Sequence, residues 1–474
     1  MIAEDEFYTE YIEEPDLMFS GGVSKDPRVG LVKHGPRTPS NESEHLVVKV
    51  GLIGSSYSIG ALERLFDDMR HQITVDKEEP ERWNPPFPGL GEDSAFNFSL
   101  NFQKRWRQTI TSREISAIKN VRDKDERIEK ALEYITNHIG ILYSKETPPD
   151  IIFVAIPEEI KKACTPSGQK RPKLQTGQSD FRSRIKLAGM KNKIPTQLIR
   201  PSTLRGEGTQ DKANMAWNLA VAILYKARKG HPWKLTKLEQ GTCYAGISFY
   251  RERGQDSNRT CPTSAQVFLE TGESFILRGD PVEEEQKGRG NNHLSHDDAE
   301  RVVNQILEQY ERIKGMQPER LVLHKTSEYW DEEREGFLDG ADGIRKLDFV
   351  TIRQDHPLRL FSSGDYPVLR GTLATPPNEQ EHYLFTKGFI PSLSTYPEQR
   401  IPKPVVVKPD NEINDSSYQE ICREILSFTK LDWNNSHFCG KMPVTIDVSR
   451  AVGRILAESI SQDMSVDPHY YFYM

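Results

Sequence analysis

Residues 148–230 carry the pattern that most restricts the possible fold, because short apolar runs alternate there with helical segments. Residues 148–164, "PPDIIFVAIPEEIKKAC", read as a strand that leads into a helix, and residues 180–192 as a second helix. The short strand "IPTQLI" follows, and a long helix over 211–230 ends at Gly230. Strands that alternate with helices form a parallel sheet with helices packed on it. We therefore predict a Rossmann-like α/β domain here.

The chain from residue 239 onward has a different order of elements. Strands expected near 243–250, 264–270 and 273–278 form a meander, after which helices alternate with strands. Antiparallel strands followed by alternating strands and helices are typical of an RNase H-like fold. The overall prediction is thus an α/β chain with a Rossmann-like domain, then an RNase H-like domain.

Outside these two regions the expected elements are simpler. Residues 1–43 are rich in Gly, Pro and Ser and predict a loop-rich segment with one short strand. A buried strand within 45–56 leads into a helix over 59–73, and one charged helix is expected over about 112–143. A Gly/Pro-rich loop region is expected after the strand at 347–354.

Charge is distributed unevenly along the chain. The net charge of −7 over 474 residues argues weakly against nucleic-acid binding. Residues 161–205, however, hold twelve Lys or Arg residues and one acid, Asp180, and such a local basic field can bind phosphates. A solvated basic loop explains the same composition. The five scattered cysteines and the lack of a long apolar run favour a cytoplasmic protein that neither enters a membrane nor binds zinc.

Several motifs together resemble prokaryotic Argonautes and follow the order of that family. The resemblance spans nearly the whole chain, and it implies an introductory segment (1–146), a MID domain (147–238) and a PIWI domain (239–474), as in the short Argonautes. The motifs are "DLMFSGGVSKDPRVGLVKHGP", "VGLIGSS", "FPGL", "IPTQLIRPSTL", "NLAVAILYKARKGHPWKL", "YPVLRGT", "LFTKGFIPSLSTYP" and "FTKLDWNN".

The resemblance implies that the MID domain holds the 5′ phosphate of a guide strand. Arg182 and Lys186 are four residues apart and project from one face of a predicted helix, although such a pair is often simply solvent-facing. Gln197 and Lys226 stand where the family places phosphate-binding residues, and Lys212 near a helix N-terminus is a weaker candidate. Many relatives have Tyr or His in place of Arg182, so charge here replaces stacking on the first base.

The resemblance also gives the C-terminus a role. The aromatic end "YYFYM" is expected to lie beside the MID pocket, where the carboxylate of Met474, with Gln197, would hold Mg²⁺ against the 5′ phosphate. A hydrophobic tail that merely docks explains the aromatic residues equally well.

The nuclease site of an active PIWI domain needs several carboxylates around two metal ions. In "TCYAGISFYRER" the first position is Ser248, the third falls on Thr326, and the fourth on Arg450. A hydroxyl is a poor substitute for a carboxylate and an arginine repels a cation. Only the second position, among Glu283, Glu284 and Glu285, retains an acid. We therefore expect no enzyme activity and no catalytic metal. Glu328, Asp331 and Asp447 are close in sequence and could in principle replace the lost carboxylates, but their spacing does not indicate a metal site.

The function implied is that of a sensor. A small guide, expected to be RNA, would pair with complementary single-stranded DNA that the chain does not cut. The signal would pass to a partner protein that carries an APAZ region fused to an effector. The effector would be a sirtuin-like or TIR NADase, or else a nuclease. The two chains would form a heterodimer able to oligomerise on target binding. Abortive defence against plasmids or phages would follow. The alternatives are a guided nuclease that uses non-standard acids and a basic nucleic-acid binder without guides.

Overall fold

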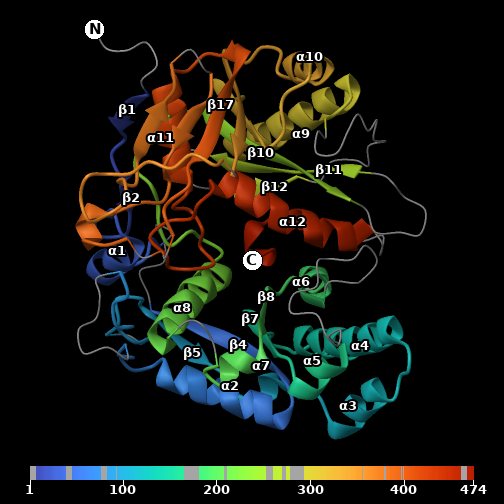
Figure 1. Ribbon diagram of the computed structural model, residues 1–474. Helices are drawn as coiled ribbons and strands as arrows, with labels where there is room; N and C mark the ends of the chain where they lie inside the picture. The colour runs from blue at the N-terminus through green and yellow to red at the C-terminus, as the bar shows by residue number, and fades with distance from the viewer. Residues whose placement is uncertain are drawn as a thin grey trace.

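The chain folds into two α/β units, each built on its own large sheet, with the C-terminus between them (Figure 1). None of the helices in the described part of the chain is both long and apolar enough to cross a membrane. The computed structural model describes residues 7–38, 45–75, 83–91, 93–164, 181–207, 211–251, 260–269, 274–277, 293–354, 356–377, 380–396, 398, 400–460 and 467–474.

The first unit has a parallel sheet, as the alternating pattern predicts. The strand order is β5-β4-β7-β8, with β6 also paired to β4, and every pairing is parallel. Because β4 pairs directly with β7, the unit begins near residue 46 and not at the expected boundary of 147. The strands are β4 (Leu46–Gly54), β5 (Phe98–Asn101), β6 (Arg107–Thr109), β7 (Ile151–Ala155) and β8 (Thr196–Ile199).

Helices cover both faces of this sheet: α2 and α8 pack on one face, and α3 to α6 on the other. The single helix expected over 112–143 is two helices, because Asp123 caps a new N-terminus by accepting a hydrogen bond from the backbone of Glu126 at 2.9 Å. The helices are α2 (Ser56–Asp68), α3 (Ser112–Lys119), α4 (Lys124–Tyr143), α5 (Glu158–Cys164), α6 (Phe181–Lys191), α7 (Pro201–Leu204) and α8 (Lys212–Arg228), with the short 3-10 helix η1 (Lys104–Trp106).

The second unit has a mixed sheet of nine strands in the order β1-β15-β16-β17-β14-β13-β10-β11-β12. The meander and the parallel strands β13 and β14 confirm the RNase H-like prediction. The region expected to be a loop contributes β15, β16 and β17 instead. The strands are β10 (Thr242–Arg251), β11 (Thr260–Leu269), β12 (Ser274–Ile276), β13 (Arg320–Lys325), β14 (Lys346–Arg353), β15 (Thr372–Thr375), β16 (His382–Leu384) and β17 (Val405–Asn414).

Alternation along β10 explains why this sheet has helices on both faces. Tyr244 belongs to the core shared with α11, α12 and the first unit, whereas Cys243 and Ala245 face α9 and α10. Gly246 permits the close approach of α12, because a Cβ there would lie 1.9 Å from the carbonyl oxygen of Thr445. The helices are α9 (His296–Lys314), α10 (Asp331–Gly340), α11 (Tyr418–Phe428) and α12 (Val444–Ile460), with η2 (Pro391–Leu393) and η3 (Tyr470–Phe472).

The N-terminal segment has more strands and helices than the one short strand expected, and it pairs with the second unit. β1 (Tyr8–Tyr11) pairs with β15, while β2 (Leu17–Met18) pairs with β3 (Val23–Ser24) and β9 (Lys234–Leu235). The helix α1 (Pro27–His34) was not predicted. Its signal is local: Asp26 accepts hydrogen bonds from two backbone amides at the start, and Pro27 occupies the first turn.

Candidate phosphate-binding site

Two lysines of the first unit come together in its interior. Lys186, in the middle of α6, is 2 % exposed, and Lys226, in the last turn of α8, is fully buried. The ammonium of Lys186 donates to the carbonyl of Thr196, and that of Lys226 donates to Oε1 of Gln197. The structure thus brings Lys186, Gln197 and Lys226 into one site, and excludes the alternative that Lys186 is solvent-facing.

Close packing of α6 on β8 makes this arrangement possible. A Cβ at Gly189 of α6 would lie 2.7 Å from the carbonyl oxygen of Ile194 and 2.8 Å from Cγ2 of Thr196. Glycine therefore lets the helix approach the strand, and Lys186, one turn earlier, reaches the backbone of β8.

The electrostatics of the site favour an anion. Burial and, to a smaller extent, the charge of the nearby Arg182 together lower the pKa of Lys226 to about 7. Burial also lowers the pKa of Lys186, and the charges of Lys226 and Arg182 add to the decrease. The two amines are within hydrogen-bonding reach of one another. Among the described residues, no acidic side chain pairs with either lysine. Two protonated amines here would repel each other unless an anion lay between them.

The C-terminus lies next to this cluster. Helix η3 packs against α6, α8 and β12, and Met474 is buried. Met474 and Arg182 line one cavity of about 150 Å³ between the two units. The cavity wall also includes Asp432, Asp447 and Tyr473, which sequence spacing could not associate with Arg182 because they lie some 250 residues away.

Lys212 does not belong to the cluster. It begins α8 and is exposed, whereas Lys226 is in the last turn of the same helix. Fourteen residues of helix separate the two by about 21 Å. The helix N-terminus that made Lys212 a candidate therefore points away from the site. Part of the basic segment, residues 165–180, is outside the described residues.

The expected nuclease positions lie at the carboxyl ends of β10 and β13. These strands are parallel neighbours, and their last paired residues are Gly246 and His324. Ser248 and Thr326 each follow two residues after this last pair. Ser248 is in a β-bulge and is 6 % exposed. Arg450 is on α12, whose Thr445 hydroxyl contacts Nδ1 of His324 at 2.9 Å. The Arg450 side chain and Glu283, Glu284 and Glu285 are outside the described parts.

The nearby acids do not converge on a metal site. Glu328 pairs with Lys408 at 2.8 Å and with Arg353 at 3.5 Å. Asp331 is almost fully exposed at the start of α10, and Asp447 lines the cavity beside Arg182. Within the described ranges, no group of three or more His, Cys, Asp or Glu residues is arranged to hold a metal ion.

Solved structures of Argonautes share this fold over nearly the whole chain. Clostridium butyricum Argonaute bound to a guide DNA and a target DNA is 15% identical, with a TM-score of 0.62, and the match covers 98% of this chain and 55% of that one. Drosophila Piwi is 12% identical, with a TM-score of 0.61 and coverages of 98% and 56%. Marinitoga piezophila Argonaute, in complex with a 5′ OH guide RNA, is 13% identical, with a TM-score of 0.58 and coverages of 98% and 60%.

No family model and no curated protein matches the sequence. The likeness to the solved structures therefore rests on the fold, and it identifies the chain as having the MID-PIWI fold of Argonaute proteins. The chain spans somewhat more than half the length of the solved structures it matches.

Proposed function

We propose that the protein binds the 5′-phosphorylated end of a small guide strand at Lys186, Gln197 and Lys226, with Arg182 at the edge of the site. The buried lysine pair, which lacks an acidic partner among the described residues, is the observation that carries this proposal. A terminal phosphate supplies the compensating charge and accepts several charge-assisted hydrogen bonds. Guides that differ only in a 5′ phosphate or a 5′ hydroxyl, compared by fluorescence anisotropy, test it, because the phosphorylated guide should bind more tightly.

A divalent cation beside the phosphate fits the residues of the neighbouring cavity. The end of the chain at Met474, with Asp432 and Asp447, lines the space next to Arg182, and Mg²⁺ prefers carboxylate oxygens. Burial raises the pKa of Asp432, and Asp447 adds to the increase. Gln197 instead directs its oxygen to Lys226. These three residues would therefore hold the ion, which would neutralise phosphate charge.

Affinity for the phosphorylated guide should fall as pH rises above about 7. The pKa of Lys226 is about 7 in the free protein, and Arg182, Lys186 and Gln197 face its amine. A bound phosphate favours the protonated amine, so binding above this pH takes up a proton, and affinity falls by up to about tenfold per pH unit. The measurement is the affinity ratio of phosphorylated to hydroxyl guide from about pH 6 to 9. A constant ratio over this range would contradict the assignment of Lys226.

The guide is proposed to be RNA and the target a complementary single-stranded DNA. The protein is proposed to act in the cytoplasm. Base pairing would supply sequence recognition while the protein grips the backbones. Sequencing of the nucleic acid that co-purifies with the protein tests both the guide chemistry and its length.

Target cleavage is not expected from this chain. Ser248, Thr326 and Arg450 replace the acids that two metal ions require, and Glu328 is engaged by two cations. Purified protein with guide, labelled target and Mg²⁺ or Mn²⁺ should leave the target intact over many hours. A discrete product opposite a fixed guide position would instead support the alternative, a guided nuclease with non-standard acids.

A chain that recognises a target without cutting it needs a partner to act. We infer an APAZ-containing effector, with a sirtuin-like or TIR NADase as first choice and a nuclease as the alternative, in a heterodimer that serves defence against plasmids or phages. The support is the set of residues at the expected nuclease positions, where Ser248, Thr326 and Arg450 stand in place of carboxylates. Co-expression with the neighbouring reading frame should give a stable complex, in which guide and target together trigger loss of NAD. Purification as a lone monomer despite co-expression would count against this partner.

A further inference from the structure

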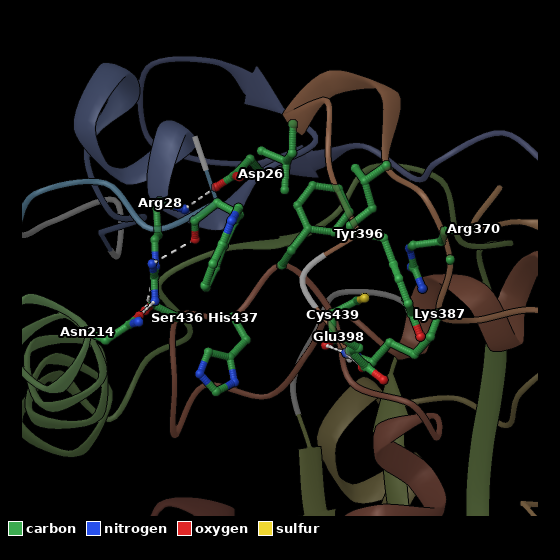
Figure 2. Close-up of a pocket in the computed structure, with 15 residues that line it drawn as sticks. Asp26, Arg28, Asn214, Arg370, Lys387, Tyr396, Glu398, Ser436, His437 and Cys439 are labelled. Carbon is green, nitrogen blue, oxygen red and sulfur yellow. Dashed lines mark hydrogen bonds and ion pairs between the residues drawn. The ribbon is translucent and has the colours of Figure 1, made fainter. Parts of the chain in front are cut away.

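A second cavity, of about 250 Å³, lies where the N-terminal segment, the start of α8 and two loops of the second unit meet (Figure 2). Three motifs that carry the family resemblance line it, yet the phosphate site uses none of these residues. They contribute Arg28, Arg370, Lys387 and Tyr396, and Ser436, which follows a fourth motif, "FTKLDWNN", lines the cavity as well. Asn214, in the first turn of α8, also lines this cavity, so it lies about 18 Å along the helix from Lys226.

Arg28 places a buried positive charge at one side of this cavity. Its guanidinium donates to Oγ of Ser436 at 3.0 Å, to the carbonyl of Trp83 at 3.2 Å, and to Oδ1 of Asn214. All three acceptors are neutral, and the side chain is 4 % exposed. Asp26 and Asp211 act on it only through space. A buried cation without a carboxylate contact among the described residues favours an anionic ligand.

Lys387 faces the cavity from the other side, and Figure 2 shows His437 below the space between the two cations. The Lys387 ammonium donates to the carbonyl of Cys439 at 2.9 Å and pairs with the exposed Glu398 at 3.4 Å. Burial, together with the charges of Arg28 and Lys387, lowers the pKa of His437 to about 4. Because His437 is neutral at physiological pH, it can accept or donate a hydrogen bond without changing the charge of the cavity. Arg370, in contrast, is matched by Glu14.

The remaining lining suits a flat ring. Trp83, Tyr396 and Phe438 border the cavity, and the Tyr396 hydroxyl donates to the carbonyl of Arg400, which orients its ring. A nitrogenous base can stack on an aromatic side chain. The volume is slightly below the range of about 300–1,000 Å³ that is usual for ligand sites, so it fits one nucleotide rather than a larger cofactor.

We propose that this cavity is a nucleotide site separate from the lysine cluster, with the phosphate near Arg28 and Lys387 and the base against Tyr396. The inference goes beyond the proposed function and does not depend on it. The nucleotide can be a free one or one unit of a bound strand, since both present the same phosphate and base.

Calorimetric titration of the full chain with AMP tests the site, with inorganic phosphate and adenosine as partial ligands. AMP should bind more tightly than either. Lys387→Met should lower its affinity roughly tenfold or more, as expected for one charge-assisted hydrogen bond, and Tyr396→Leu should lower it by removing the stacking surface. Lys403→Met is the matched control, because this exposed lysine does not line the cavity. Unchanged thermal unfolding of each variant excludes misfolding.

Repeating the titration with a 5′-phosphorylated guide already bound distinguishes the two sources. Loss of AMP binding means that a nucleotide of the strand occupies the cavity, whereas retained binding means a free nucleotide does. The inference is overturned if wild type and Lys387→Met bind AMP equally, including no binding by either. Discrimination between phosphorylated and hydroxyl guides, measured on Lys387→Met, reports on the lysine cluster and keeps the two proposals apart.

Discussion

Replacing Lys186 and Lys226 together by methionine should abolish the preference for a phosphorylated guide. Each lysine is buried and aimed at β8 beside the other, so both would donate to one phosphate. A charge-assisted hydrogen bond contributes about 1.5–3 kcal/mol, or roughly ten- to 150-fold in affinity. The double variant should lose less than the sum of the two single effects, because the two amines are coupled. Fluorescence anisotropy with phosphorylated and hydroxyl guides measures the change.

Lys212→Met provides the matched control, since it removes one lysine from the far, exposed end of α8. It should leave the preference unchanged. Methionine resembles lysine in shape and carries no charge to bury, so the fold should persist in the double variant. If the double variant still prefers the phosphorylated guide, the phosphate binds elsewhere. If the wild type shows no preference at all, the protein is a basic nucleic-acid binder without guides.

Glu14→Gln should destabilise the protein by about 3–5 kcal/mol, because it removes the partner of two buried cations. The Glu14 carboxylate accepts from Nε of Arg370 at 2.7 Å and from Nζ of Lys430 at 2.6 Å. Burial raises the pKa of Glu14, but Arg370 and Lys430 together hold it below its usual value. Chemical denaturation at neutral pH measures the loss.

Two controls sharpen this test. Glu13→Gln removes an adjacent but exposed acid and should have little effect. Because the pKa of Glu14 is lower in the folded state, its stabilisation is present above about pH 4.5 and is lost as the pH falls through the folded pKa. The difference between wild type and Glu14→Gln should therefore shrink in acid. Equal stability of the two proteins at neutral pH would mean that Arg370 and Lys430 do not need this carboxylate.

Periodicity predicted the two sheets and most of their helices, but not the whole of either unit. β7 is a continuous apolar run and β8, β10, β13 and β14 each contain a shorter apolar stretch, so local sequence is sufficient to find them. β15 and β16 have four and three residues, and the ten-residue β17 lies among prolines, so their sequences resemble loops. The pairing of β15 with β1 and of β17 with β14 joins them to the sheet. The strand β4 was predicted within residues 45–56, but its pairing with β7 could not be, because the choice of neighbouring strand depends on contacts between distant segments.

The sequence likewise identified some residues of the candidate site and not others. The spacing of Arg182 and Lys186 and the resemblance around Gln197 and Lys226 were enough to select the lysine cluster. Lys212 was selected as a weaker candidate on local grounds, its place at a helix N-terminus, yet the other end of α8 faces the site. The burial of Lys186 could not be predicted from the sequence either, since a basic pair on a helix is usually solvated.

The sequence by itself determined the elements, their order and the residues at the expected nuclease positions, because these depend on neighbours within a few residues. The tertiary structure alone decided which charges meet. It buried two lysines against each other, brought Met474 and Asp432 beside Arg182, and joined Arg28 and Lys387 around a cavity. The physical reason is that burial and electrostatic coupling arise from contacts across hundreds of residues, and a periodic pattern carries no information about such contacts.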